Sequence, residues 1–474
     1  MNIKNFKVDN MIVSKIKSSH ILNYNRLNSG YYLNQDAINS RILEDNSDKC
    51  VELQTLADVR NPPIFKRQFC EKSENAIHYC QSSDVVNAFE GSDVYVNKIH
   101  TLKVGADVSD KQILVTGFGT IGNTRLVNRL SEGYCYANNV CRIDVNNKSL
   151  YGYIYALMTS RYGKSQLNKN ASGSVVRYIE APGIKKTLVP ILNTTVQDEI
   201  HKLIIQSKDL KVDANILLSE ADMLFHDDNN IIYEDYHLSE SENKKYKSFV
   251  VKVSDKTKIT LKAKNFSKRI TEIIDLWSDR KGKVLKEYLS EDFKIGMRGF
   301  FKRIDSDTIG TEMVSQGDLH KSNIKYFKRV IVSRANEEDI ANENQVLFPA
   351  VGNGSSESEI LFRPTLASDL FNGKLLSGDI GRFNCHSKED AAYLLAVLRS
   401  KGGFRIMRSL YYGTQLRRPN WNLLNEINIP MASQESFNVI SEKVLLAYKY
   451  KDLADVKENE AIRILEKEIE QWEK

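Results

Sequence analysis

The sequence predicts an α+β fold of two tandem mixed α/β domains, each followed by a long helix, in a pseudo-twofold internal repeat. Three observations predict it: residue blocks recur half a chain apart, short β-branched segments alternate with helical ones, and two stretches have heptad spacing. The expected parts are a first mixed domain over 1–193, a helix over 194–226, a linker and start of the second repeat over 227–264, a second mixed domain over 265–432 and a second helix over 433–474.

The internal repeat is visible as markers that recur in the same order. The matched pairs are QILVTGFG at 112–119 with QVLFPAVG at 345–352, Gly173 with Gly413, Pro190 with Pro430, and Phe65-Lys66-Arg67 with Phe301-Lys302-Arg303. The offset is 345 − 112 = 233 for the first pair and 413 − 173 = 240 for the second. A duplicated chain tends to pack about a pseudo-twofold axis, and duplex DNA is the commonest partner with that symmetry.

The composition is that of a folded protein with more than one core. The chain has 474 residues, 41% of them hydrophobic and 27% charged, and a mean hydropathy of −0.41. A net charge of +6 is compatible with a nucleic-acid partner but is weak support for one. The sequence has no long apolar run, no apolar N-terminal segment and no His or Cys spacing typical of a metal site, which favours a cytoplasmic protein with reduced thiols and no metal.

Short strands and two matching helices are expected inside the mixed domains. The expected strands are 51–53, 111–116 and 140–145 in the first repeat, and 250–253 and 258–261 at the start of the second. Residues 149–159 are expected to form a helix, and 388–398, with acidic residues in its first turn, to form its counterpart.

Two longer stretches alternate apolar spacings of three and four, which is the pattern of a coiled-coil seam. The first seam consists of Ile200, Leu203, Ser207, Leu210, Ala214, Leu217, Ala221 and Leu224. The second consists of Phe437, Ile440, Val444, Ala447, Ala454, Ala461, Leu465 and Trp472, and Lys451, Glu458 and Glu468 interrupt it. At about 1.5 Å per residue, a helix over 195–225 would be about 45 Å long and one reaching the C-terminus about 60 Å. We expect the two seams to pack on each other, with the polar interruptions setting their register.

Two patterns resemble catalytic motifs. Gly117–Gly122 fits G-x-G-x-x-G after an apolar strand, and Asn61-Pro62-Pro63 resembles the N-P-P motif of amino-methyltransferases. Together they would describe a stand-alone or permuted adenine-N6 DNA methyltransferase. We favour a simple β-turn, because Ile64 lacks the aromatic ring of that motif and neither pattern survives in the second repeat.

The chain resembles the DNA specificity subunit of type I restriction–modification systems over nearly its whole length. The resemblance is carried by the block 112–127 with its Gly119-Thr-Ile-Gly122, by the run from Gly173 through Pro190 to Ile200 and its echo after Gly413, and by the opening Arg26–Tyr32. It implies two target-recognition domains and two spacer helices that form an antiparallel coiled coil. The second copy lacks Gly-Thr-Ile-Gly, which leaves a related methylation-based phage-defence system open.

The resemblance also implies a non-enzymatic role. Each recognition domain would read one half of a bipartite, asymmetric site in double-stranded DNA, and the helices would fix the spacing. Two methyltransferase subunits would dock on this chain, and a motor-nuclease restriction subunit could join them. S-adenosylmethionine would bind the partner methyltransferase, and no cofactor is expected in this chain.

The expected DNA contacts lie in the matched loops, because Arg and Gln read bases while Lys grips phosphate. In the first repeat they are Lys66, Arg67, Thr120, Asn123, Arg125 and Arg177. In the second repeat they are Arg298, Lys302, Arg303, Asn353, Ser355, Gln415, Arg417 and Arg418. The residues expected at the helix–helix interface are Ile200, Leu203, Leu210, Leu217, Leu224, Phe437, Ile440, Val444 and Leu465.

Overall fold

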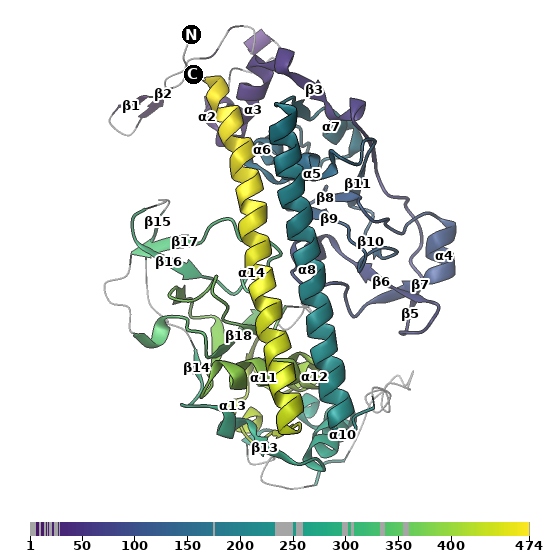
Figure 1. Cartoon of the computed structure of the whole chain (residues 1–474), viewed down its shortest axis with the longest axis vertical. Helices are drawn as coiled ribbons and strands as arrows, with labels where there is room; N and C mark the ends of the chain where they lie inside the picture. The colour runs from purple at the N-terminus through teal and green to yellow at the C-terminus, as the bar shows by residue number, and fades with distance from the viewer. Residues whose placement is uncertain are drawn as a thin grey trace. The chain divides into compact units, whose positions relative to one another are not determined.

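A computed structural model gives the fold of the chain as two compact units. Unit 1 comprises residues 1–212 and 454–474, and unit 2 comprises residues 213–453. The structure describes residues 6–8, 11–13, 16, 18, 21–22, 27, 29–173, 176–232, 250–252, 259–295, 302–304, 308–331, 337–353 and 360–473. Each unit is a mixed α/β body that includes part of both long helices, so the C-terminal residues complete the first unit (Figure 1).

Unit 1 contains two four-stranded sheets and a small two-stranded one. One sheet has the order β4-β11-β8-β9, with bounds Ala57–Arg60, Val140–Val145, Ile113–Thr116 and Thr124–Leu126. The other has the order β10-β6-β7-β5, with bounds Cys135–Tyr136, Ala76–Cys80, Tyr95–Asn97 and Phe69–Cys70. The two-stranded sheet pairs β3 (Cys50–Glu52) with β12 (Leu188–Pro190). The N-terminal hairpin is β1 (Phe6–Val8) with β2 (Met11–Val13). The shorter helices are α2 (Ser29–Leu33), α3 (Gln35–Asp45), α4 (Lys98–Lys103), α5 (Tyr151–Thr159), α6 (Arg161–Lys169) and α7 (Ala181–Lys185).

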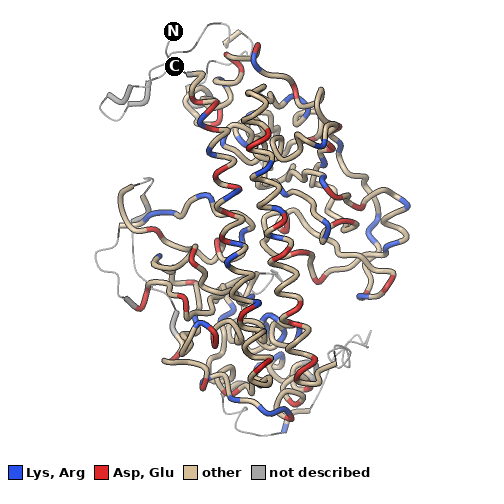
Figure 2. The backbone as a smooth tube through the Cα atoms, viewed as in Figure 1, with Lys and Arg blue, Asp and Glu red and all other residues tan. Residues whose placement is uncertain are grey.

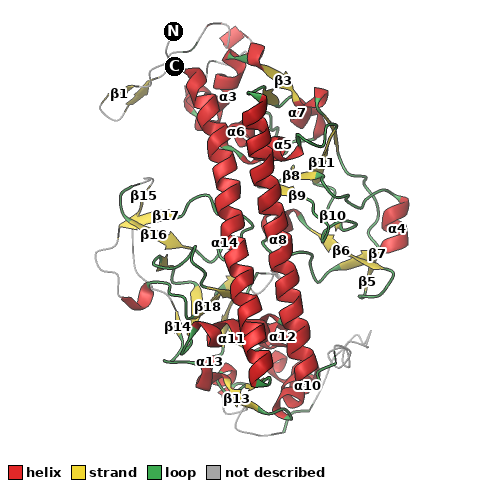
Figure 3. Ribbon diagram, viewed as in Figure 1, coloured by secondary structure: helices red, strands yellow, loops and turns green. Residues whose placement is uncertain are grey.

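Unit 2 repeats these sheets in the same order. Figure 3 shows its strands in yellow. The first is β14-β22-β18-β20, with bounds Lys294–Ile295, Ile380–Asn384, Gln345–Pro349 and Thr365–Leu366. The second is β21-β16-β17-β15, with bounds Leu375–Leu376, Thr311–Val314, Lys328–Ile331 and Lys302–Ile304. The small pair is β13 (Gly282–Val284) with β25 (Asn428–Pro430), and a third sheet joins β19 (Gly352–Asn353), β24 (Leu416–Pro419) and β23 (Tyr411–Tyr412). The shorter helices are α10 (Lys268–Ser278), α11 (Lys388–Arg399), α12 (Lys401–Ser409) and α13 (Trp421–Leu424).

The pairing of the strands shows where along the chain the offset between the two copies changes from 233 to 240. Ile113 pairs with Leu126 in unit 1, and Val346 pairs with Leu366 in unit 2. The offsets are 346 − 113 = 233 on one strand and 366 − 126 = 240 on the next. The loop between these strands, which contains the glycine block in unit 1, is therefore 240 − 233 = 7 residues longer in unit 2.

The predicted match of Lys66-Arg67 with Lys302-Arg303 is wrong by two residues. Phe69 pairs with Val96 in unit 1, and Arg303 pairs with Val330 in unit 2, so 303 − 69 = 330 − 96 = 234. Arg303 therefore occupies the strand position of Phe69, whereas Arg67 lies in the loop before that strand. Matching the two adjacent basic residues of each copy gives an offset of 236, whereas the pairing of the strands gives 234.

The core of each unit is built around a short, almost fully buried helix. All nine residues of α5 are buried, as are Ala391–Leu398 of α11. Ser160 and Ser400 end these helices and cap the next, and their hydroxyls accept hydrogen bonds from the Gly163 and Gly403 amides at 3.2 Å and 3.1 Å.

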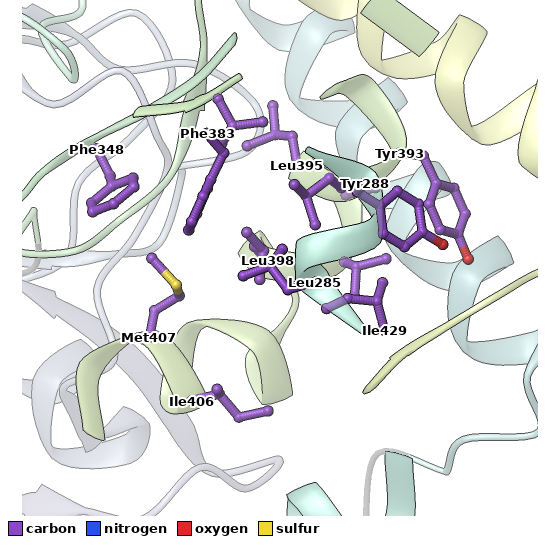
Figure 4. Packing of buried hydrophobic residues seen from close by; sticks show 14 of the residues in the cluster. Leu285, Tyr288, Phe348, Phe383, Tyr393, Leu395, Leu398, Ile406, Met407 and Ile429 are labelled. Atoms are coloured by element: carbon purple, nitrogen blue, oxygen red, sulfur yellow. The ribbon is translucent and has the colours of Figure 1, made fainter. Parts of the chain in front are cut away.

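Unit 2 shows how such a helix is enclosed. Figure 4 shows Leu395 and Leu398 of α11 between the rings of Phe348 and Phe383 on one side and those of Tyr288 and Tyr393 on the other. These residues belong to the largest apolar cluster of the unit, which also includes side chains of both long helices.

The long helices are α8 (Thr194–Asp228) and α14 (Gln434–Glu470), with 35 and 37 residues. The first is shorter than the second, as expected, but only by two residues (37 − 35 = 2). Within unit 1 the Lys457 ammonium donates to Gln206 Oε1 at 2.8 Å, and within unit 2 the Lys443 ammonium donates to Glu220 Oε2 at 2.7 Å. Also within unit 2, the Ser436 hydroxyl donates to Asp228 Oδ1 at 2.6 Å, so the partner on α14 changes from 443 to 436 as the residue on α8 changes from 220 to 228, and the two helices run antiparallel there. Figure 2 shows basic and acidic residues interspersed along both.

The buried face of each helix is broader than the predicted seam. Ile200, Ile440, Val444 and Leu465 are fully buried, while Phe437 and the predicted leucines Leu203, Leu210, Leu217 and Leu224 are only partly buried. Ile204, Leu218 and Phe225, which lie one position after three of those leucines, are buried instead. In each unit, the segments of both helices pack on the mixed part as well as on each other, and that requires a wider apolar stripe than a coiled-coil seam.

Other local predictions have mixed outcomes. The strand over 140–145 and the helix over 388–398 are confirmed by β11 and α11. The strands expected over 250–253 and 258–261 are wrong where the structure describes them, because residues 250–252 and 259–261 form no strand, while Val253 and Lys258 lie outside the described residues. Among the helices of the described residues, none is long and apolar enough to cross a membrane.

Candidate nucleic-acid interface

In unit 1, two loops that are far apart in the sequence lie against each other. Phe118, in the glycine block after β8, forms an antiparallel bridge with Tyr178, and the Gly119 amide donates to the Arg177 carbonyl at 3.4 Å. The turn itself is held by Thr116, whose hydroxyl donates to the Thr120 carbonyl at 2.5 Å and accepts from the Asn123 amide at 3.0 Å. The predicted contacts at Thr120 and Arg177 are therefore brought together on one exposed edge.

Unit 2 repeats this pairing of loops. Gly352 and Asn353, which follow β18, pair with Arg417 and Leu416. The second loop is a hairpin in both units: Ser172 pairs with Tyr178, and Tyr412 pairs with Arg418, at an offset of 240. The same loop-on-hairpin arrangement in both copies is the feature most clearly retained outside the cores.

A glycine sets the bend of each hairpin. Gly173 has φ +90° and Gly413 has φ +85°, a conformation that side chains rarely adopt. A Cβ at Gly173 would collide with the Val176 carbonyl oxygen, and one at Gly413 with the Leu416 carbonyl oxygen. Glycine is thus required at both matched positions for a steric reason.

The predicted contacts in unit 1 divide into exposed and buried residues. Lys66, Arg67, Thr120 and Arg177 are exposed and Asn123 is half-buried. The Arg67 guanidinium donates to Asn138 Oδ1 at 2.9 Å and lies 5.3 Å from the Tyr79 ring centroid, and Arg177 donates to the Asn168 carbonyl.

Arg125 requires a correction. Its side chain is 8% exposed, it donates to the Asn87 carbonyl at 2.7 Å, and it forms an ion pair with Glu90 at 2.5 Å. Charge–charge attraction from Glu90 raises the pKa of Arg125 above its ordinary value despite its burial. The residue ties β9 to the loop before β7 and is not presented at the surface.

In unit 2, the predicted DNA contacts whose side chains the structure describes are Gln415, Arg417 and Arg418, and all three lie on the hairpin. Gln415 is exposed, and Arg417 and Arg418 are half-buried on β24. Lys302 and Arg303 lie on β15, and Asn353 on β19. Arg298 and Ser355 lie outside the described residues.

Two exposed rings of unit 1 were not predicted. Phe118 and Tyr178 are stacked, with centroids 5.5 Å apart and planes 16° apart, yet remain 39% and 37% exposed. Their counterparts in unit 2 are Val351 (351 − 118 = 233) and Arg418 (418 − 178 = 240), so the aromatic pair belongs to one copy. The bridge between distant loops creates the pair, and no local sequence pattern predicts it.

The catalytic look-alikes have structural roles. The Asn61 amide oxygen accepts from the Ala181 backbone amide at 2.9 Å and from the Cys141 thiol at 3.4 Å, so it anchors the start of α7. Gly117–Gly122 leads into strand β9, whereas a dinucleotide loop opens a helix whose N-terminus holds the phosphates. Within the described residues, no group of three or more His, Cys, Asp or Glu side chains could hold a metal ion.

Comparison with known proteins gives matches among solved structures. No protein-family model and no curated protein matches the chain. The type I restriction–modification S subunit from M. genitalium matches 90% of this chain and 95% of its own at 12% identity and a TM-score of 0.33. The HsdS subunit from Thermoanaerobacter tengcongensis matches 89% and 95% at 11% identity and a TM-score of 0.26. The type IIG restriction endonuclease BpuSI matches 40% and 30% at 8% identity and a TM-score of 0.30.

Proposed function

We propose that this chain is the DNA specificity subunit of a type I restriction–modification complex or of a related methylation-based defence system. The observation that carries the proposal is the paired loop and hairpin present once in each unit, at matched positions with the same glycine constraint. Two copies of one exposed, polar and basic edge suit a duplex with two half-sites.

The two edges present different chemistry, which implies different half-sites. Unit 1 offers Thr120, Arg177 and the rings of Phe118 and Tyr178, whereas unit 2 offers Gln415, Arg417 and Arg418 on a hairpin beside a loop seven residues longer (240 − 233 = 7). Arg and Gln can form paired hydrogen bonds with guanine and adenine, and apolar side chains contact the thymine methyl group. The recognised site is therefore bipartite and asymmetric.

The antiparallel helices are proposed to act as the spacer between half-sites and as a docking surface for methyltransferase subunits. Their buried faces are occupied within each unit, while Met223 of α8 and Val439 of α14 remain 51% and 37% exposed in unit 2. The partner subunits would bind S-adenosylmethionine and transfer the methyl group to flipped adenines.

Selection from a random duplex library by the full chain together with its methyltransferase tests this function. We expect two short conserved blocks separated by a constant spacer, and adenine methylation at the same motif in the genome of the source organism. Deleting the gene for this chain should abolish that methylation. Unchanged methylation, or a library with no enriched sequence, would contradict the proposal.

A further inference from the structure

Three cations converge on one tyrosine ring beside the unit 2 hairpin. The Lys262 ammonium is 4.2 Å from the Tyr411 ring centroid, the Arg417 guanidinium carbon 4.9 Å and the Lys264 ammonium 5.9 Å. Tyr411 itself is 5% exposed, so the ring is a fixed platform, while Lys262 and Arg417 are half-buried and Lys264 is exposed.

The segment that carries the two lysines is anchored. The Asn265 amide donates to the Ser409 carbonyl at 2.6 Å, and its oxygen accepts from the Thr260 hydroxyl at 2.9 Å. The Lys262 backbone amide donates to the Thr260 hydroxyl at 3.1 Å, and its ammonium donates to the Gly413 carbonyl at the bend of the hairpin. The lysines are thus held against the hairpin that also carries Gln415 and Arg417.

We infer that Lys262, Lys264 and Arg417 form a phosphate-binding site that holds a phosphodiester group of the DNA bound by unit 2. The inference rests on the proposed function and adds two residues to its DNA contacts. Like charges held around one ring repel each other, and an anion between them offsets that repulsion. Burial and the nearby Arg417 charge lower the pKa of Lys262, which is the direction that positive surroundings produce.

Lysine ammonium groups are compact charges that suit phosphate better than the planar edge of a base. The site therefore supplies affinity and orientation, and the hairpin residue Gln415 reads sequence beside it. The matched position of unit 1 has no ring, because the counterpart of Tyr411 is Ala171 (411 − 171 = 240). This phosphate site, built on the Tyr411 ring, is therefore not repeated at the matched position of the first copy.

The test compares Lys262→Ala/Lys264→Ala with Lys283→Ala/Lys286→Ala, which removes two exposed lysines elsewhere in unit 2. The probe is a labelled duplex that carries the selected motif, titrated with the full chain at several salt concentrations. For the first variant we expect the slope of log K against log salt to fall by about 1 for each phosphate that the variant no longer binds, with the preferred sequence unchanged. The control should keep the wild-type slope.

Single phosphates replaced by neutral methylphosphonates give a second readout. One position opposite unit 2 should weaken binding of the wild type but not of Lys262→Ala/Lys264→Ala. Equal sensitivity of both proteins at every position, or equal slopes for the two double variants, would overturn the phosphate site. Wild-type protein that shows no sequence preference would instead overturn the proposed function.

Discussion

The Tyr155 phenol donates a hydrogen bond to Glu458 Oε1 at 2.9 Å, inside the packing of the two long helices in unit 1. Glu458 Oε2 accepts from the Lys211 ammonium at 2.6 Å, and the Glu458 side chain is only 3% exposed. The counterparts of Tyr155 and Glu458 in unit 2 are Leu395 (395 − 155 = 240) and Leu218 (458 − 218 = 240), both fully buried. The positions of Tyr155 and Glu458 are therefore apolar in unit 2, whereas in unit 1 they belong to a buried network with an ion pair.

Glu458→Gln should destabilise unit 1 more than a matched change at an exposed pair between the same helices. Removing the buried negative charge leaves Lys211 without its strongest ionic partner, and since Lys211 is 22% exposed we expect a loss of about 3 kcal/mol, the low end for a broken buried pair. Glu220→Gln breaks the Lys443 pair, whose side chains are 27% and 40% exposed, and should cost about 1 kcal/mol or less. Urea unfolding followed by circular dichroism gives both values.

The double variant Glu458→Leu/Lys211→Met provides the control. It replaces both members of the pair with apolar groups, as Leu218 takes the place of Glu458 in unit 2, and should recover most of the stability, because well-packed apolar residues often match a buried ion pair. Equal losses of unfolding free energy for Glu458→Gln and Glu220→Gln would show that the buried network of Glu458 stabilises the protein no more than the exposed pair does.

The sequence predicted the parts of the fold that depend on local patterns. Heptad spacing placed both long helices, and the run Val140–Val145 placed the central strand β11. It identified Glu458 as an interruption of the seam, and the structure shows why the interruption is tolerated. It missed the sheet containing β5 and β7, because strands of two and three residues pair across segments that carry no alternating pattern.

The candidate site was predicted in part. The glycine turn and the matched glycines Gly173 and Gly413 were found because both copies share them, but the hairpins and the bridge between Phe118 and Tyr178 depend on contacts that the sequence pattern does not show. Arg125 was misplaced because the sequence does not distinguish a surface arginine from a buried one that is paired with Glu90. Lys262 and Lys264 escape prediction because their polar segment has the composition of a linker and an opening strand.

Tyr153→Phe and Tyr393→Phe should both be destabilising, and the second more so. The two hydroxyls donate to the carbonyls of Pro190 and Pro430 at 2.7 Å and 2.8 Å, at matched positions. Tyr393 also accepts from the Ala432 amide at 2.9 Å, so its loss leaves two buried backbone groups without that partner. At about 1 kcal/mol per hydrogen bond we expect about 1 kcal/mol for the first change and about 2 kcal/mol for the second in urea unfolding. The reverse order would contradict the assignment.

Gly413→Ala should weaken DNA binding far more than Gly373→Ala. Both residues have positive φ, +85° and +76°, so alanine is strained at either position. A Cβ at Gly413 would also meet a backbone oxygen, whereas a Cβ at Gly373 has nothing within 4 Å. In Gly413→Ala the bend of the hairpin must shift, and this displaces Gln415 and Arg417. We expect a cost of about 1.4 kcal/mol in binding free energy, which is a loss on the order of tenfold in affinity for the selected motif. Comparable affinities for the two variants would argue against a role for the hairpin in DNA binding.

Stability should fall as the pH drops below about 6.5, and His320 should account for much of the fall. Burial, with the charges of Arg363 and Lys451, lowers the pKa of His320 from 6.5 to about 3. Below pH 6.5 the unfolded chain binds a proton that the folded chain excludes, so the contribution of this residue is full above that pH and declines toward pH 3. From pH 7 to pH 5 the loss should be about 2 kcal/mol. His320→Gln, which can still donate to the Arg363 carbonyl, should flatten this dependence, and the exposed control His386→Gln should not.

The stacked rings of Phe118 and Tyr178 should contact a thymine methyl group in the half-site read by unit 1. Both rings are exposed beside Thr120 and Arg177, and apolar side chains recognise thymine through this methyl group.

Replacing single thymines by deoxyuridine removes the methyl group and keeps the base pair. At one position of that half-site, affinity should drop about fourfold, from about 0.8 kcal/mol per buried methyl group. Phe118→Ala/Tyr178→Ala should be insensitive to the same replacement, and replacements in the other half-site should affect both proteins equally, because the rings belong to unit 1. A wild type that binds every deoxyuridine duplex as tightly as the thymine duplex would rule this contact out.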